Sequence, residues 1–173
     1  MNIKDNRRVQ LTKRMIKEAF LRLLEKNDIQ SITVRELCNI ADVNRATFYK
    51  YYENPYALLD EINQDFYEKL SFFLSTDKPD SLIKALEYVA MNIWECSIIL
   101  RNQSNSDFLE TILKQPAISA AITSGFEHDS SDLIDYKKEF YIYGSYRVIL
   151  KWIENECKEP ANEIASLIYR LTR

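Results

Sequence analysis

Apolar residues recur every three or four positions along most of this chain. Between residues 9 and 26 they are Leu11, Met15, Ile16, Ala19, Phe20, Leu23 and Leu24. This spacing is that of an amphipathic α-helix with one buried stripe. Similar spacing predicts further helices over residues 33–41, 45–52, 55–74, 82–100, 104–114, 116–126, 132–156 and 161–171. The pattern therefore predicts an all-α protein.

Several of these predicted helices begin at residues that cap a helix N-terminus. Thr33 is followed three positions later by Glu36, which is the arrangement of a capping box. Asn44 precedes the third helix, and Asn54 precedes a proline in the first helical position of the fourth. Only 2 Gly and 4 Pro occur in 173 residues, which favours long helices over a turn-rich sheet fold.

The composition argues against several kinds of site. The three cysteines lie far apart and the one histidine, His128, is in a polar stretch, so we expect reduced thiols and no metal site. No phosphate-binding glycine loop or nucleophile motif is present, so we expect no cofactor and no catalytic residue. Because the sequence shows neither a signal peptide nor an apolar run of membrane-spanning length, we expect a cytoplasmic protein without a membrane partner.

The charge is unevenly distributed along the chain. Residues 1–52 carry eleven Lys and Arg against six Asp and Glu, a net charge of +5, and the remainder carries −8, for a total of −3. A basic first third on an acidic body fits phosphate binding at one end of the molecule. The asymmetry is weak evidence by itself.

The strongest functional signal is residues 33–58, TVRELCNIADVNRATFYKYYENPYAL. Two short capped helices joined by a turn of a few residues form a helix-turn-helix, whose second helix enters the DNA major groove. An arginine there can reach a guanine edge, and hydroxyl or ammonium groups can donate to phosphates. Phe48 and Tyr52 must face inward to anchor that helix. The outward candidates are Arg45, Ala46, Thr47, Tyr49 and Lys50.

With the preceding helix, these residues resemble the N-terminal DNA-binding domain of the TetR family. The elements T-V-R-E-L, A-x-V-N-R-A-T-F-Y-K and Y-A-L follow the family pattern in order and spacing. The resemblance implies a repressor that binds a palindromic operator as a dimer and releases it when a ligand or a partner binds the C-terminal domain. By position it implies DNA contacts from Thr33, Arg35, Arg45, Ala46, Thr47, Tyr49 and Tyr51.

Some of these assignments have simpler alternatives. Arg35 can be a solvated charge on its helix, and Tyr51 can serve packing alone. Lys4, Arg7 and Arg8 can form an arm that touches DNA, although a mobile tail is the favoured interpretation.

Two positions depart from the family pattern. Asp42 occupies the turn position that is usually Gly; Asp tolerates the left-handed conformation at some cost, so we expect the turn to persist. Pro55 occupies the start of the fourth helix, where the family often has a lysine that meets a phosphate. This chain is therefore expected to bind DNA somewhat more weakly or to rely on Lys50 and Tyr56.

The C-terminal part predicts an interface between two copies. Residues 141–168 resemble the C-terminal domain of a Gram-positive TetR subgroup that includes regulators of dihydroxyacetone kinase operons. The predicted helix 132–156 is apolar nearly all round from Phe140 to Ile153, so it needs cover on more than one side. A four-helix interface with a second copy would supply that cover. The expected interface residues are Gly144, Ile164, Leu167, Ile168 and Leu171.

The sequence thus predicts a DNA-binding domain over residues 1–54 and an effector-sensing and dimerisation domain over residues 55–173, the latter a helical bundle. The expected function is that of a DNA-binding repressor released by a small-molecule effector; the alternative is a regulator or activator switched by a protein partner. An enzyme is disfavoured. Candidate ligand residues, which core packing would explain equally well, are Tyr88, Trp94, Arg101, Phe108 and Tyr143.

Overall fold

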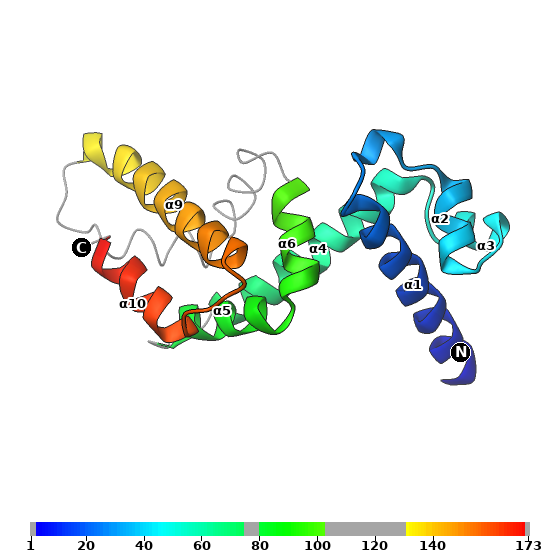
Figure 1. Ribbon diagram of the computed structural model, residues 1–173, viewed down its shortest axis with the longest axis horizontal. Helices are drawn as coiled ribbons and strands as arrows, with labels where there is room; N and C mark the ends of the chain where they lie inside the picture. The colour runs from blue at the N-terminus through cyan, green and yellow to red at the C-terminus, as the bar shows by residue number, and fades with distance from the viewer. Residues whose placement is uncertain (1–2, 75–79, 103–130, 172–173) are drawn as a thin grey trace. The chain divides into compact units, whose positions relative to one another are not determined.

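A computed structural model describes residues 3–74, 80–102 and 131–171 of the chain (Figure 1). Every regular element in these ranges is helical, as the apolar spacing predicts. The elements are α1 (Ile3–Leu24), the 3₁₀ turn η1 (Ile29–Ser31), α2 (Val34–Ala41), α3 (Arg45–Tyr49), α4 (Pro55–Leu74), α5 (Ser81–Met91), α6 (Ile93–Asn102), α9 (Ser131–Glu154) and α10 (Ala161–Leu171). The predicted helices over 104–114 and 116–126 lie outside the described residues.

The chain divides into two compact units, Met1–Phe66 and Tyr67–Arg173. The division falls inside α4, twelve residues after the boundary at 54 that the sequence suggests. The reason is that Leu58, Ile62 and Phe66, along the first three turns of α4, are buried and belong to the same unit as the preceding helices. The first turns of α4 therefore belong to the core of the first unit.

The first unit is built on the packing of α1 against α2 and of α2 against α3. Most positions that the apolar spacing predicts to be buried are buried, although Leu11, at the start of the α1 stripe, is 49% exposed. The large fully buried side chains of this unit are Ile16, Phe20, Leu21, Leu37, Phe48, Leu58, Ile62 and Phe66. This core anchors the short helix α3, which packs against α2.

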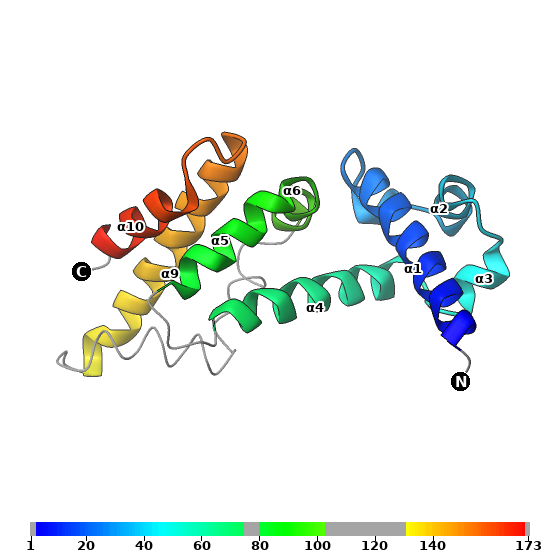
Figure 2. The same cartoon turned by 90° about the horizontal axis from the view of Figure 1, so that it is seen from below.

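The second unit packs α10 against α5 and α9, and α6 against α9 and α5 (Figures 1 and 2). Two of its aromatic side chains donate hydrogen bonds to backbone carbonyls. The Tyr146 hydroxyl donates to the carbonyl of Leu100 at 3.2 Å, and the Trp152 indole N–H donates to that of Glu159 at 2.8 Å. The first bond ties α9 to α6, and the second ties the end of α9 to the loop before α10.

Helix boundaries differ from the sequence prediction at several points. The predicted helix 82–100 is two helices, because Asn92 leaves the helical conformation at φ −120° and ψ 33° and its side-chain amide donates to the Tyr88 carbonyl at 2.8 Å. Asparagine favours such breaks because its side chain competes for backbone groups. α3 ends at Tyr49 rather than at 52. α1 begins at Ile3, which places Arg7 and Arg8 on a helix and not in a mobile tail.

Among the described helices, none combines the length and the apolar character needed to cross a membrane.

Candidate nucleic-acid interface

Both helices of the predicted helix-turn-helix begin at the expected cap. Thr33 has extended backbone, and its hydroxyl oxygen accepts from the Glu36 N–H at 3.2 Å. The Asn44 side-chain oxygen accepts from the backbone N–H of Thr47 at 2.7 Å and from its hydroxyl at 2.9 Å. Such caps satisfy N–H groups that have no partner inside the helix. The capping predictions at Thr33 and Asn44 are confirmed.

The turn between α2 and α3 depends on one left-handed residue. Asp42 lies at φ 51° and ψ 46°, and its N–H donates to the carbonyl of Cys38. The N–H of Val43 donates to the same carbonyl at 3.1 Å. Both bonds satisfy the end of α2 and reverse the chain direction. As expected, the turn forms with Asp42 in place of the usual glycine.

α3 has a buried side and an exposed side. Phe48 is fully buried and Tyr52, just after the helix, is 4% exposed. Their ring centroids lie 5.7 Å apart, and Tyr49 meets Phe48 edge-on at 5.6 Å while remaining 57% exposed. The inward anchors are therefore the two aromatic residues that the sequence indicates.

The residues predicted to contact DNA differ in their solvent exposure. Thr33, Arg35, Arg45, Ala46, Tyr49 and Lys50 are exposed, whereas Thr47 and Tyr51 are half-buried. The Thr47 hydroxyl donates to Asn44, and the Lys50 ammonium lies 5.7 Å from the Tyr51 ring centroid. Burial raises the pKa of the Cys38 thiol, and the positive charge of Arg45 opposes that shift. Arg45 therefore places a cation where α2 and α3 meet.

A polar cluster that the sequence analysis did not identify ties α3 to the longer helices. The Glu61 carboxylate of α4 accepts from the Tyr52 hydroxyl at 2.8 Å and from the Lys13 ammonium of α1 at 2.9 Å. Lys13 also lies 5.3 Å from the Tyr52 ring centroid. In the sequence, Lys13 and Glu61 are charged residues next to the apolar stripes of two predicted helices. That position alone does not show that they pair across 48 residues.

The cluster shifts the ionisation of its members. Burial raises the pKa of Tyr52 well above its ordinary value, and the hydrogen bond to Glu61 raises it further. Burial alone would raise the pKa of Glu61, but the hydrogen bonds from Lys13 and Tyr52 and the charges of Lys13 and Lys17 outweigh it, so the pKa is lowered. At neutral pH the cluster is therefore a carboxylate held by an ammonium and a neutral phenol.

A basic hollow of about 890 Å³ lies beside this cluster in the first unit. Glu61 and Asp65 pair with Lys13 and Lys17, at 2.9 and 4.0 Å. Exposed arginines supply the rest of its positive charge. The hollow is lined by Arg7, Arg8, Gln10, Leu11, Lys13, Arg14, Lys17, Tyr52, Glu61 and Asp65.

The ligand candidates of the second unit are not brought together by any contact that the structure describes. Tyr88 is half-buried and lies 5.7 Å from the Phe73 ring and 5.9 Å from the Lys69 ammonium. Trp94, on α6, is 40% exposed, Tyr143, on α9, is 39% exposed, and Arg101 is exposed. Phe108 lies outside the described residues. Within the described part of the chain, a ligand cavity lined by these residues therefore remains a prediction.

The interface candidates are divided between the core and the surface. Ile164 is 7% and Ile168 2% exposed, because α10 packs on α5 and α9 of the same chain. These two side chains leave little surface for a second copy, and their assignment to the interface stays a prediction. Leu167 is half-buried and Leu171 is 59% exposed. Gly144 is exposed, and among the described residues no atom would lie within 4 Å of a side-chain Cβ placed there.

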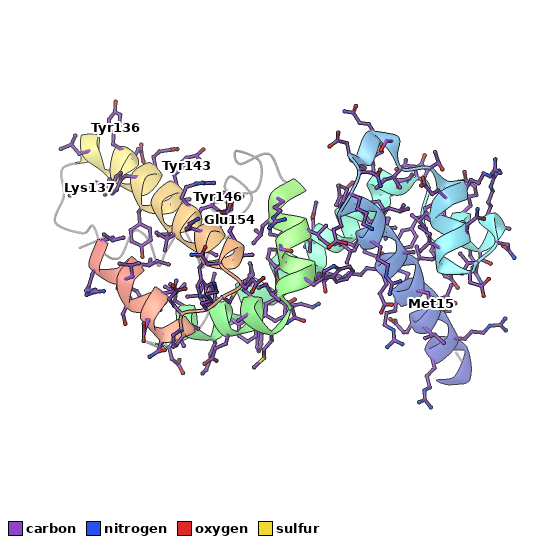
Figure 3. All side chains as sticks on the ribbon, in the orientation of Figure 1. Met15, Tyr136, Lys137, Tyr143, Tyr146 and Glu154 are labelled. Atoms are coloured by element: carbon purple, nitrogen blue, oxygen red, sulfur yellow. The ribbon has the colours of Figure 1, made fainter. Side chains whose placement is uncertain are left out.

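An exposed apolar face on α9 lies next to Gly144 in the helical pattern. We call it the α9 face: Leu133, Tyr136, Phe140 and Tyr143 are spaced three or four apart and are 56%, 75%, 74% and 39% exposed. Figure 3 shows Tyr136 projecting from α9 on the side away from α10. The adjoining side of α9 is buried through Ile142, Tyr146 and Leu150. The apolar residues around this helix thus form two groups: one packs in the core of the second unit, and the other is exposed.

Comparison with known proteins matches this architecture. The TetR C-terminal family described as "Transcriptional regulator C-terminal region" matches residues 77–173. The uncharacterized HTH-type transcriptional regulator YxbF of Bacillus subtilis is 23% identical over 167 residues, covering 90% of this chain and 43% of that protein. The chain therefore spans less than half the length of this relative.

Two solved structures share the fold. A TetR transcriptional regulator from Streptococcus agalactiae has a TM-score of 0.74 and 22% identity over 99% of this chain and 98% of its own. The dihydroxyacetone kinase operon activator DhaS has a TM-score of 0.57 and 21% identity over 93% of both chains. Since the family match covers more than half of the chain and the helical fold agrees with it, the chain belongs to the TetR family of transcriptional regulators and is not an enzyme.

Proposed function

We propose that this protein binds a palindromic DNA operator as a homodimer and represses transcription until a small-molecule effector binds the second unit. The observation that carries the proposal is α3 itself. Arg45, Ala46, Tyr49 and Lys50 are exposed on a capped helix that Phe48 and Tyr52 anchor in the core. A helix held in this way after a tight turn has the form of the DNA-reading element of a helix-turn-helix.

Each exposed side chain has a role that suits its chemistry. Arg45 carries paired donors for the guanine edge in the major groove, and Ala46 leaves room for close approach. Tyr49, Lys50 and Thr33 offer donors to phosphates, which fix the register on the duplex. Thr47 is the weakest of the candidates, because its hydroxyl already donates to Asn44.

The basic hollow gives α1 a part in backbone binding. Arg7, Arg8 and Arg14 are exposed, and the ion pair recorded for Arg14 is a loose 3.8 Å contact with Glu18. Guanidinium groups favour phosphate oxygens, and each phosphate that they neutralise adds to the salt dependence of binding. We assign these arginines to phosphates beside the operator groove.

The α9 face is the surface we assign to dimerisation. Four exposed apolar side chains on one helix face amount to a patch that monomeric proteins seldom leave uncovered. A second copy of α9 would cover it, with Gly144 allowing close approach and Leu171 extending the seam. Stable dimers of this kind commonly bury about 2,000 Å² or more.

A second candidate is a regulator that activates transcription or that answers to a protein partner. DhaS, which shares this fold, is named an operon activator. Trp94 and Arg101 are exposed on α6, which suits a docking surface as well as a ligand pocket. Titration of metabolites against the DNA complex separates the two signals, and a reporter assay separates repression from activation.

The proposal is tested by selecting binding sites from random duplexes and measuring the affinity of the selected site. Arg45→Ala should weaken specific binding by about 1–3 kcal/mol if Arg45 reads a base. Lys50→Ala should weaken binding to all duplexes alike and reduce the slope of log K against log salt by about 1. A wild-type protein that selects no duplex, with and without candidate effectors, would refute the DNA-binding function.

A further inference from the structure

The Glu61 carboxylate is a point at which three parts of the first unit meet. It belongs to α4, accepts from Lys13 of α1 at 2.9 and 3.2 Å, and accepts from the hydroxyl of Tyr52, just after α3, at 2.8 Å. The Lys13 and Glu61 side chains are 32% and 42% exposed. The cluster is thus partly shielded from water, where charged hydrogen bonds are stronger than at a fully exposed surface.

Aromatic contacts lead from this carboxylate to the exposed side of α3. The Tyr52 ring lies 5.7 Å from Phe48, and Phe48 lies 5.6 Å from Tyr49. Tyr52 and Phe48 are buried, so neither ring can be expected to reach a base, and the Glu61 carboxylate is engaged by Tyr52 and Lys13. Backbone bonds follow the same route, because the N–H of Tyr52 donates to the carbonyl of Phe48 at 3.0 Å.

α3 has only five residues and cannot hold its own orientation. Burial of Phe48 fixes the depth of α3, but apolar contacts are not directional and restrict rotation and tilt less than a directed hydrogen bond does. The Tyr52 hydroxyl supplies that directed bond. Its acceptor, Glu61, is in turn fixed by the Lys13 ammonium.

The geometry points to Glu61 as a positioning residue for DNA recognition: through Tyr52 it sets the orientation in which α3 presents Arg45 and Tyr49. This inference rests on the proposed function and assigns Glu61 no DNA contact. Because the carboxylate acts on orientation, its loss should weaken specific binding more than non-specific binding. Glu61→Leu frees Lys13 in the basic hollow and Asp65→Leu frees Lys17 there, so the two variants should change the salt slope alike.

The chain contains a matched control one helical turn further along α4. Asp65 pairs with Lys17 of α1 at 4.0 Å, so it joins the same two helices, and no hydrogen bond to Tyr52 is recorded for it. Glu61→Leu and Asp65→Leu each remove one α1–α4 ion pair. Only Glu61→Leu removes the acceptor of Tyr52. Tyr52→Phe removes the hydroxyl and keeps the buried ring, and Glu61→Gln keeps an oxygen that can accept from it.

The experiment measures two properties of each variant at a temperature where all are folded. The first is amide hydrogen exchange at residues 48–52 without DNA, and the second is the ratio of specific to non-specific DNA affinity. We expect Glu61→Leu and Tyr52→Phe to speed amide exchange at residues 48–52 and to reduce the affinity ratio about 3–10-fold. A reduction of this size corresponds to the loss of one directed hydrogen bond. The double variant should be no worse than the worse single one, Glu61→Gln should recover part of the ratio, and Asp65→Leu should match wild type.

The inference is overturned if Asp65→Leu has the same effect as Glu61→Leu, or if the Glu61 and Tyr52 effects multiply. It is equally overturned if neither variant changes exchange or the affinity ratio. Because exchange is measured without DNA, unchanged exchange counts against the positioning role whatever the DNA result. A wild type that selects no duplex counts against the proposed function.

Discussion

The side-chain oxygen of Asn44 accepts two hydrogen bonds from Thr47, from its backbone N–H at 2.7 Å and from its hydroxyl at 2.9 Å. The pair closes the first turn of a helix that spans only Arg45–Tyr49. Since so short a helix gains little from its own backbone bonds, the cap supplies a large share of its local stability.

Asn44→Ala should therefore destabilise the protein by about 1 kcal/mol, within the usual range of about 0.5–2 kcal/mol for a lost N-cap. Asn44→Ser, which keeps a capping oxygen, serves as the control and should stay close to wild type. Denaturant melts measure both. Equal stabilities for the Ala and Ser variants would show that the cap does not support α3.

Replacing Asp42 should separate the cost of the left-handed turn from the rest of the motif. Asp42 lies at φ 51° and ψ 46°, a conformation that costs most residues with a side chain roughly 1–2 kcal/mol. Asp42→Gly should raise the free energy of unfolding by up to about 1 kcal/mol, and Asp42→Ala should lower it. A stabilising Asp42→Ala would contradict the strain argument.

The arginines of the basic hollow should appear in the salt dependence of DNA binding. The double variant Arg7→Ala/Arg8→Ala should reduce the slope of log K against log salt by about 2, since each arginine is assigned one phosphate. Arg22→Ala, exposed in the last turn of the same helix, is the control and should leave the slope unchanged. If the double variant keeps the wild-type slope, the hollow does not bind the DNA backbone.

Charges placed on the α9 face should produce monomers that remain folded. Phe140 is 74% exposed and Gly144 has open space around it, so Phe140→Glu and Gly144→Arg break no core contact among the described residues. Light scattering should show half the wild-type mass, with unchanged helical circular dichroism. Tyr56→Glu, at a 50% exposed position of the first unit, is the control. A wild type that is monomeric at micromolar concentration removes the dimer.

The Glu61 cluster should make part of the stability depend on acid pH. The pKa of Glu61 is lowered in the folded chain by Lys13, Tyr52 and Lys17, in spite of burial. An unfolded glutamate has a pKa of about 4.3, so this stabilisation is complete above that pH and is lost as pH falls through the lower folded value. The stability gap between wild type and Glu61→Gln should narrow on acidification below about pH 4.3. A gap that widens would contradict this assignment.

Local chemistry explains what could be predicted from sequence. The caps at Thr33 and Asn44 act over three residues, and the left-handed turn at Asp42 depends on one residue between two helices. Phe48 and Tyr52 face inward because their four-residue spacing places them on one side of the chain segment. A short stretch of sequence is therefore enough to predict both the helix-turn-helix and the family to which the chain belongs.

Tertiary structure decided the features that depend on distant partners. Lys13 and Glu61 are 48 residues apart, and nothing in either helix alone indicates their pairing. The apolar spacing of Ile164 and Ile168 is the same whether α5 or a second copy covers them, and α5 covers them. The sequence by itself therefore determined the helix caps, the left-handed turn and the helix-turn-helix, because their causes are local. Which apolar face is core and which remains uncovered, and which charges meet, was decided only by folding, because burial depends on what the rest of the chain leaves exposed.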